Sequence, residues 1–383
     1  MTLDRLREEF PHTRTQTYLN HASTGVYSQR VANAIHEWVL DRSGREIENF
    51  VTIQPRVDDC LARIGRLLNV PASRVEFTAN TSDALALLAE GLDLHPGDRV
   101  AVPACEFPAN VYPFLHLERK GVAVDFIPHT DGVITLADIE RTLTPRTRLV
   151  SVSWVQFLSG YRLDVKAVAE IVHAHGAFLC VDGIQGLGAL RLDVADAGID
   201  FLACGAQKWL LATQGLGFLY CSEALQARIT PRAGWLHGPV DWENFFDYRL
   251  AFFEDARRFR IGTLNHLGVM ALRAALELYE DAGPAACEAR VLAHAGRLRD
   301  GFAEMGLGCY GDCEPAHASG IVTIRHADPD GLYAHLRARG ISASCRNRLV
   351  RFSPTYYNSA AEIDRALDAV ETFAPSRVAV SVA

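Results

Sequence analysis

The chain has 383 residues, of which 22% are charged and 49% hydrophobic, and its formal net charge is −8. This composition is typical of a globular protein with a large core, and the length predicts two domains or one large domain with a smaller partner. The acidic balance, with no basic cluster interleaved with aromatics, argues against a nucleic-acid-binding protein. No apolar run reaches 18 residues and the N-terminal segment is not a signal region, so we expect no membrane association. Nine scattered cysteines form no metal-ligand motif and favour a cytoplasmic location.

Short β-rich runs alternate with helical patterns between residues 75 and 225. Strands that are apolar along nearly their whole length, with helices between them, predict a mostly parallel α/β sheet covered on both faces. The expected strands are 99–103, 122–127, 148–154, 177–182, 199–203 and 217–220, and the expected helices include 84–92 and 165–175.

The pattern changes after residue 262. A long helix rich in Ala and Leu is expected over 262–281, and residues 285–383 mix helices with short strands at 320–325 and 348–352. We therefore expect a large domain over residues 21–261 and a smaller α/β domain over 262–383, with residues 1–20 packed against the smaller one. Ligands of parallel sheets bind outside the carboxyl ends of the strands, so residues that follow strands are the candidates for a site.

Lys208 is the first such candidate. The chain has 38 basic residues but only three lysines, and Lys208 lies in the apolar segment 201–211 with no acidic neighbour in sequence. A buried ammonium is costly unless it is paired, whereas a neutral lysine amine is a nucleophile that forms Schiff bases. The alternative is a lysine whose stem packs while its ammonium reaches water.

Asp182 ends the strand expected before Lys208, so the two side chains can face one crevice. A carboxylate beside a Schiff-base lysine is the pairing that pyridoxal phosphate requires, although Asp182 could instead cap a turn.

Asn80, Thr81 and Ser82 directly precede a helical pattern and could bind a phosphate at the start of that helix. An ordinary helix N-cap explains the same three residues.

Three further residues follow strands and suit a flat, oxygen-bearing ring. Phe107 could stack on such a ring or simply fill core. Gln156 and Gln185 could donate hydrogen bonds to a phenolic oxygen, although glutamines at strand ends are usually just solvated.

The order and spacing of these residues resemble those of the fold type I pyridoxal-phosphate enzymes of the class V aminotransferase family. That family includes cysteine desulfurases, selenocysteine lyases, kynureninases and isopenicillin N epimerase. The resemblance covers nearly the whole chain and implies a large domain with a mostly parallel, seven-stranded-type sheet, a smaller C-terminal α/β domain and a homodimer. It is carried by the segments 18–25, 181–185, 205–209, 258–265 and 351–358.

The resemblance also implies roles for individual residues. Lys208 would form the Schiff base with pyridoxal phosphate, and Asp182 would hold the pyridine nitrogen. Arg351 would bind a substrate carboxylate, for which the guanidinium geometry is well suited, and His21 is a candidate for the substrate pocket. The remaining cofactor contacts would be Phe107 on the ring, Gln156 and Gln185 at the phenolic oxygen, Thr81, Ser82, Gly205 and Gln207 at the phosphate, and Thr263 at the phosphate of the partner subunit.

The reaction expected from this resemblance starts with a carbanion at the α-carbon of a small amino acid. Elimination at the β-carbon is the favoured outcome; amino transfer comes next, and epimerisation is third because no second base is evident. A cysteine desulfurase is disfavoured, because the segment around Cys345 is short and does not match the loop that carries the nucleophilic cysteine in such enzymes. Arg346 and Arg348 could lower the pKa of Cys345, so a persulfide role stays open. The same two arginines could bind an acidic substrate side chain.

Two other functional classes are weighed against this interpretation. A nicotinamide-dependent oxidoreductase would also be doubly wound, but the glycine pairs at 186/188 and 215/217 do not form the GxGxxG unit between a strand and a helix. A catalytically inactive binding protein would have little reason to keep the lysine, the aspartate and the phosphate loop together.

Overall fold

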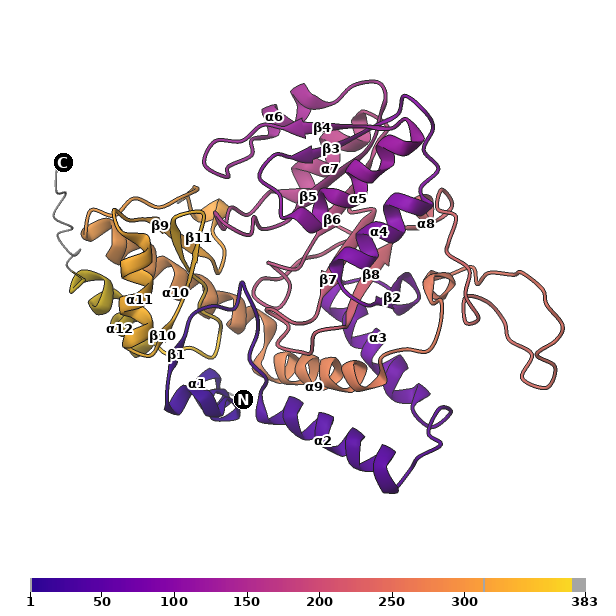
Figure 1. The fold of residues 1–383 in the computed structure, drawn as a ribbon, viewed down its shortest axis with the longest axis horizontal. Coiled ribbons are helices and arrows are strands. Elements are labelled where there is room, and N and C mark those ends of the chain that lie inside the picture. The colour runs from indigo at the N-terminus through magenta and orange to yellow at the C-terminus, as the bar shows by residue number, and fades with distance from the viewer. Residues whose placement is uncertain (1, 313, 374–383) are drawn as a thin grey trace, which may run out of the picture.

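The apolar runs expected as strands lie side by side in one seven-stranded sheet of the computed structural model, which describes residues 2–312 and 314–373 (Figure 1). The strand order is β2-β8-β7-β6-β5-β3-β4, and β8 runs antiparallel to both of its neighbours while the other pairs are parallel. The edge strand β2 was not expected. The strands are β2 (Val75–Thr78), β3 (Arg99–Pro103), β4 (Ala123–Ile127), β5 (Thr147–Ser153), β6 (Phe178–Asp182), β7 (Phe201–Gly205) and β8 (Gly217–Cys221).

Helices cover both faces of this sheet because successive side chains of a strand point to opposite sides. In β5, Leu149 belongs to the hydrophobic cluster that includes α4, whereas Val150 and Val152 belong to the cluster that includes α3, α7 and α9. The expected α/β fold class is confirmed. The helices around the sheet are α3 (Gln54–Leu68), α4 (Thr81–Gly91), α5 (Tyr112–Leu115), α6 (Leu136–Thr142), α7 (Val165–Ala174), α8 (Glu223–Gln226) and α9 (His266–Ala282).

A smaller α/β unit lies beside the sheet and is built around a three-stranded antiparallel sheet of order β11-β12-β9 (Figure 1). Its own core includes Leu298, Phe302, Val322 and Phe352. Its elements are α10 (Pro284–Glu304), β9 (Val322–Arg325), α11 (Pro329–Ala338), β10 (Ile341–Ser342), β11 (Ser344–Arg346), β12 (Leu349–Phe352) and α12 (Ala360–Glu371).

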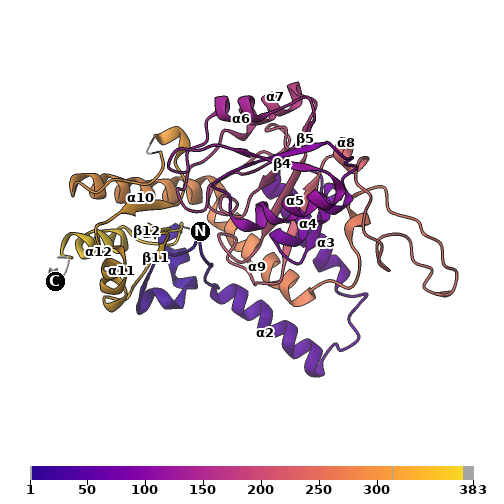
Figure 2. The same ribbon diagram turned by 45° about the horizontal axis from the view of Figure 1, so that its top comes forward.

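The packing divides the chain later than the boundary expected at residue 262. Helix α9 lies along α2 (Gln29–Gly44) and against α3, as Figure 2 shows, and its buried residues join the cluster of the large sheet. Apart from Leu19 of the N-terminal segment, the first buried residue in the core of the smaller unit is Ala295 of α10. No helix in residues 2–312 or 314–373 is both long and apolar enough to cross a membrane.

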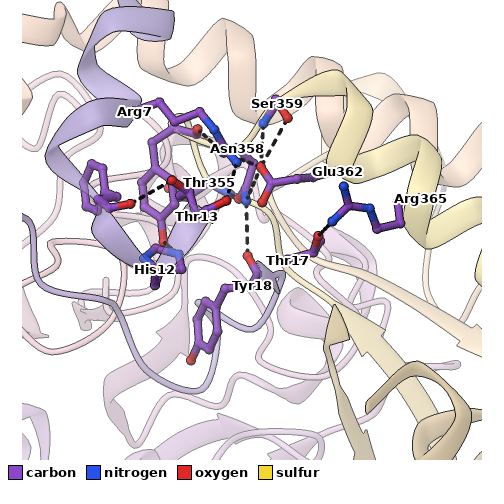
Figure 3. Close-up of polar contacts among 12 residues, drawn as sticks. Arg7, His12, Thr13, Thr17, Tyr18, Thr355, Asn358, Ser359, Glu362 and Arg365 are labelled. Atoms are coloured by element: carbon purple, nitrogen blue, oxygen red, sulfur yellow. Dashed lines mark hydrogen bonds and ion pairs between the residues drawn. The ribbon is translucent and has the colours of Figure 1, made fainter. Parts of the chain in front are cut away.

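The N-terminal segment is bound to the smaller unit. Strand β1 (Thr17–Tyr18) pairs in parallel with β10, and the side chain of Arg365 donates to Oγ1 of Thr17 at 3.1 Å. Figure 3 shows the polar contacts at this junction. Glu362 lies at their centre: its carboxylate accepts hydrogen bonds from Arg7, from the backbone N–H of Ser359 at 2.9 Å and from Nδ2 of Asn358 at 3.3 Å.

We expect Glu362→Gln to destabilise the protein because the substitution removes the buried negative charge that faces Arg7. Loss of a charged hydrogen-bond partner typically lowers the free energy of unfolding by about 1–3 kcal/mol. Asp364→Asn is the matched control, because the ion pair of Asp364 with Arg297 is about half exposed and such pairs contribute about 0–1 kcal/mol. Thermal unfolding followed by circular dichroism measures both effects. Equal shifts of the melting temperature would contradict a special role for Glu362.

Candidate functional site

The candidate site lies where β5, β6 and β7 end. Register pairing brings Ser153, Asp182 and Ala203 next to one another across these three strands. The Asp182 carboxyl is buried, and its Oδ1 accepts the backbone N–H of Ile184 at 2.9 Å. Burial raises the pKa of Asp182 to about 7, although the hydrogen bond from Ile184 and the nearby charge of Lys208 both favour ionisation. A neighbouring cation, such as a protonated pyridine nitrogen, would therefore stabilise the carboxylate.

Lys208 lies in the turn just beyond β7, and its Nζ is 5.6 Å from the centre of the Phe107 ring. Burial lowers the pKa of Lys208 to about 8; the charge of Asp182 opposes this, and the charges of Arg351 and Arg346 add to it. The neutral amine that a nucleophile or base requires is therefore much more abundant near neutral pH than in an ordinary lysine, at roughly a tenth of the molecules at pH 7.

Close backbone packing fixes the position of Lys208. The N–H of Gly25 donates to the carbonyl of Gln207 at 2.7 Å, and a β-carbon at Gly25 would lie only 2.1 Å from the carbonyl oxygen of Lys208. Trp209, on the other side, donates from its indole N–H to Gln185 at 3.0 Å. The N-terminal segment around Gly25 therefore packs directly against the backbone of Gln207 and Lys208 and limits its movement.

The start of α4 carries groups that could bind an anion such as a phosphate. A β-carbon at Gly205 would meet Oε1 of Gln207 at 2.5 Å and Oγ1 of Thr81 at 3.2 Å, so these three residues converge on one point. Both polar atoms are buried and lack hydrogen-bond partners within the described residues. Thr81 and Ser82 are the first residues of an 11-residue helix, where backbone N–H groups are unpaired and favour an anion. With its amide turned over, Gln207 would donate to the same group.

The two glutamines are held by the protein. The Gln156 amide donates to Oε1 of Glu106 at 2.8 Å, and the Gln185 amide donates to the carbonyl of Ala22 at 3.0 Å while accepting from Trp209. Each amide has a second N–H, so donation to a phenolic oxygen stays a prediction for both. Phe107 is 41% exposed and packs edge-on against Phe157, which leaves part of its ring free for stacking.

Arg351 lies on β12 and points toward the large sheet. Its guanidinium donates to the carbonyl of Phe157 and, at 2.8 Å, to Oγ of Ser23, while its Nε has no partner among the described residues. Burial, with a smaller contribution from the charge of Arg346, lowers the pKa of Arg351 to about 10. Nothing in the described segments forms an ion pair with this buried cation, so the position favours binding of a carboxylate.

His21 and Thr263 are the two remaining candidates from the sequence, and they differ in their surroundings. His21 is fully buried, and its ring nitrogens contact the carbonyl of Ser353 at 2.9 Å and the hydroxyl of Tyr357 at 2.5 Å. Burial lowers the pKa of His21 to about 3, so the ring is neutral, and its contact with substrate stays a prediction. Thr263 is exposed and lines a separate cavity with Arg232 and Gly262.

Cys345 points away from the site. It is paired with Val350, whose side chain is in the core of the smaller unit, and its Sγ contacts Oδ1 of Asp330 at 3.5 Å. Burial and the hydrogen bond to Asp330 raise the pKa of Cys345, although the charge of Arg348 opposes the shift.

The described residues contain no group of three or more His, Cys, Asp or Glu side chains that could hold a metal.

Sequence reasoning missed Glu106 and Ser23. Glu106 is buried, and its carboxylate accepts from the backbone N–H and hydroxyl of Ser153 and from Gln156. Burial raises the pKa of Glu106, and these hydrogen bonds oppose the shift. A glutamate directly before Phe107, at the end of an apolar strand, was a signal that could have been used. Ser23 gave no such signal.

The chain is similar to known proteins along nearly its whole length. The sequence model described as "Aminotransferase class-V" matches residues 17–366. An "Uncharacterized aminotransferase YcbU" of Bacillus subtilis is 29% identical over 370 residues, which are 96% of this chain and 97% of that protein. A "Probable cysteine desulfurase" of Methanothermobacter thermautotrophicus is 31% identical over 338 residues, 86% of this chain and 83% of that protein.

Solved structures share the fold. An apo cysteine desulfurase from Thermococcus onnurineus NA1 aligns with a TM-score of 0.87 at 23% identity, covering 97% of this chain and 98% of that chain. A lysine-to-alanine mutant of C-DES with glycine covalently linked to the pyridoxal phosphate cofactor aligns with a TM-score of 0.88 at 22% identity, covering 96% and 99%. At these identities the likeness establishes the fold.

We predict that covalent attachment of pyridoxal phosphate to Lys208 in the apoprotein rises with pH through a midpoint near 8, because only the neutral amine reacts. In Asp182→Asn the midpoint should fall, since the charge of Asp182 raises the pKa of Lys208. Borohydride trapping followed by peptide mass spectrometry measures the labelling. Lys166 is an internal control, because its hydrogen bond to Asp196 raises its pKa. Equal midpoints for Lys208 and Lys166 would contradict the prediction.

Proposed function

We propose, from the premise that the chain belongs to the aminotransferase class-V family of pyridoxal-phosphate-dependent enzymes, that it is a lyase that cleaves the Cβ–S bond of a small sulfur-containing α-amino acid by elimination. The supporting observation is that the charges of Asp182 and Arg351 both act on the Lys208 amine, whereas Cys345 lies on the opposite face of its hairpin and contacts Asp330. The site therefore has a base, a carboxylate and a carboxylate-binding cation, but no nucleophilic thiol at the Cys345 position.

Pyridoxal phosphate, when bound, supplies an electron-poor ring that withdraws electrons from the substrate α-carbon. Asp182 is the residue suited to keep the ring nitrogen protonated, because a cation at that point would stabilise its carboxylate against the cost of burial. Thr81, Ser82, Gly205 and Gln207 are proposed to hold the phosphate. Phe107, Gln156 and Gln185 are proposed to contact the ring and its phenolic oxygen.

Arg351 and Lys208 are proposed to act on the substrate. Arg351 binds the α-carboxylate through the guanidinium edge left free by Phe157 and Ser23, and this contact fixes the orientation of the α-carbon. Lys208 removes the α-proton at Nζ, and the electrons of the broken C–S bond leave with the sulfur. The same ammonium then returns a proton to the departing thiolate.

The arrangement of thiols supports elimination over sulfur transfer to an enzyme cysteine. Cys345 is held by Asp330 on α11, away from the face that carries Arg351. Cys105 lies nearer the site, but burial and the charge of Glu106 raise its pKa to about 12, which keeps it protonated. Several relatives carry the name cysteine desulfurase, and that activity would need a reactive thiol elsewhere in this chain.

Amino transfer is the second candidate. The relative named as an uncharacterised aminotransferase aligns over 96% of this chain, and the same lysine, carboxylate and arginine serve both reactions. The products separate the two reactions: transfer yields the keto acid of the substrate with its side chain intact.

We also propose that the enzyme is a cytoplasmic homodimer in which Thr263 completes the phosphate site of the partner. The loop between α8 and α9 extends away from the body (Figure 1) and exposes Phe246, Tyr248 and Leu250 at 81%, 85% and 74%. Apolar side chains this exposed are typical of an interface. Cys60, Cys180, Cys204, Cys221 and Cys287 are buried free thiols, which suits a reducing compartment.

The enzyme should release pyruvate and ammonia from a sulfur-containing amino acid. Cystine, the substrate class named for the similarly folded C-DES, would also give cysteine persulfide. Lys208→Ala should lower the rate at least ~1,000-fold because it removes the proton carrier. Cys345→Ser should change the rate less than about twofold, since its thiol faces Asp330. Lactate-dehydrogenase-coupled assays measure pyruvate. Loss of activity in Cys345→Ser would favour a desulfurase, and an intact keto acid would favour amino transfer.

Light scattering of the cofactor-bound protein should give twice the chain mass of 42.1 kDa. Thr263→Val should weaken pyridoxal phosphate binding by about tenfold, because it removes one hydrogen bond to a charged group, without changing the mass. A monomer at micromolar concentration, or unchanged cofactor affinity in Thr263→Val, would contradict the proposed arrangement.

A further inference from the structure

In the hairpin that carries Arg351, the side chains of the two strands point to one or the other of its two faces. Strands β11 and β12 pair antiparallel with Ser344 opposite Arg351 and Arg346 opposite Leu349. Because side chains alternate along a strand and opposite residues share a face, Arg346 lies on the same face as Arg351. Cys345 lies on the other face, against α11.

A tight turn fixes this register. Asn347 and Arg348 connect the two strands, and both have positive φ, 50° and 59°. Two consecutive left-handed residues are typical of a two-residue hairpin turn, which leaves little freedom for the strands to slip. Arg346 is therefore held on the face of the site, whereas Arg348 lies in the turn itself.

Arg346 adds a cation that the proposed chemistry does not use. Its guanidinium is exposed and forms no hydrogen bond or ion pair with any residue that the structure describes. Its positive charge nevertheless acts electrostatically on the site, because it lowers the pKa of both Lys208 and Arg351. Three cations therefore influence one crevice, and Asp182 is the acidic side chain that most favours the charged form of Lys208.

Space for a longer ligand lies beside the same hairpin. A cavity of about 230 Å³ is bounded by Gln156 and Phe157 from the large sheet and by Asn347 and Tyr310 from the smaller unit. Phe157 is the residue whose carbonyl binds Arg351. The cavity therefore lies beside the residue that holds Arg351 and beside Asn347, which directly follows Arg346 in the chain. Its lining is mixed: it includes the polar residues Glu106, His129 and Ser159 as well as apolar ones.

We propose that Arg346 is a specificity-determining residue that binds a second carboxylate, carried at the far end of the substrate side chain. The substrate class is then an amino acid with two carboxylates, and for C–S cleavage it is a sulfur amino acid whose side chain ends in a carboxylate. Cystine has this chemistry and cysteine does not. The choice of bond rests on the proposed function; the preference for two carboxylates does not.

The test is equilibrium binding to the cofactor-bound enzyme, measured by isothermal titration calorimetry. The probes are succinate, glutarate and adipate, each compared with the monocarboxylate of equal chain length. Wild type should bind at least one dicarboxylate about tenfold more tightly than its matched monocarboxylate, as an additional charge-assisted hydrogen bond predicts. Arg346→Gln should abolish this difference and leave monocarboxylate binding unchanged. Arg346→Lys should retain part of it, because charge remains without the planar guanidinium.

Arg348→Gln is the matched control, because it removes the same charge two residues away while Arg346 stays in place. It should preserve the dicarboxylate preference. Equal affinity of wild type for both acids, or equal losses in the two Gln variants, would overturn the proposal. A dicarboxylate preference without pyruvate release from any amino acid would overturn the lyase function but leave the role of Arg346 intact. Pyruvate release without a dicarboxylate preference would support the lyase function and overturn the role of Arg346.

Discussion

The candidate site depends on the withdrawal of the Lys208 amine from water. Burial shifts the protonation equilibrium of this amine toward the neutral form, and the charge of Asp182 limits the shift. The two effects leave a lysine that can act as a base and a carboxylate that gains from a cationic partner. Neither property belongs to a single residue, because each side chain changes the ionisation of the other.

The surrounding structure keeps this pair in place with contacts from distant parts of the chain. Gly25 closes on the backbone beside Lys208 from the N-terminal side, and Arg351 reaches the same crevice from β12. The network around Glu362 holds the N-terminal segment against α12 and so supports both contributions. The candidate site thus draws residues from both the large sheet and the smaller unit.

The sequence predicted the sheet well because its strands are buried on both faces and read as continuous apolar runs. Edge strand β2 was not predicted because it is short and contains Glu76. The buried charge of Glu76 is compensated by an ion pair with Arg260, which lies far along the chain. Helix α9 was placed with the smaller domain because no local pattern reports which neighbour a helix packs against. Its start at His266 follows from Asn265, whose side chain caps the first turn; the sequence had predicted a start at residue 262.

Within the site, Lys208 and Asp182 carried local signals, whereas Arg351 was assigned only through the family resemblance. His21 contacts a partner 336 residues away, and its role at the site stays a prediction. The faces of Cys345, Arg346 and Arg348 depended on a turn type that no Gly marked.

One contact has a consequence for how the protein forms during synthesis. Arg351 binds Ser23 across 328 residues of chain, and β1 can pair only with β10, close to the C-terminal end of the described chain. A nascent chain can therefore build most of the large sheet early, whereas the substrate side of the site must wait until almost the whole polypeptide has left the ribosome. Until then the N-terminal segment has no strand to pair with. The contact of Arg351 with Ser23 is thus a late event of folding, and a truncated product lacking β12 would keep the buried lysine but lose the arginine proposed to orient an amino acid beside it.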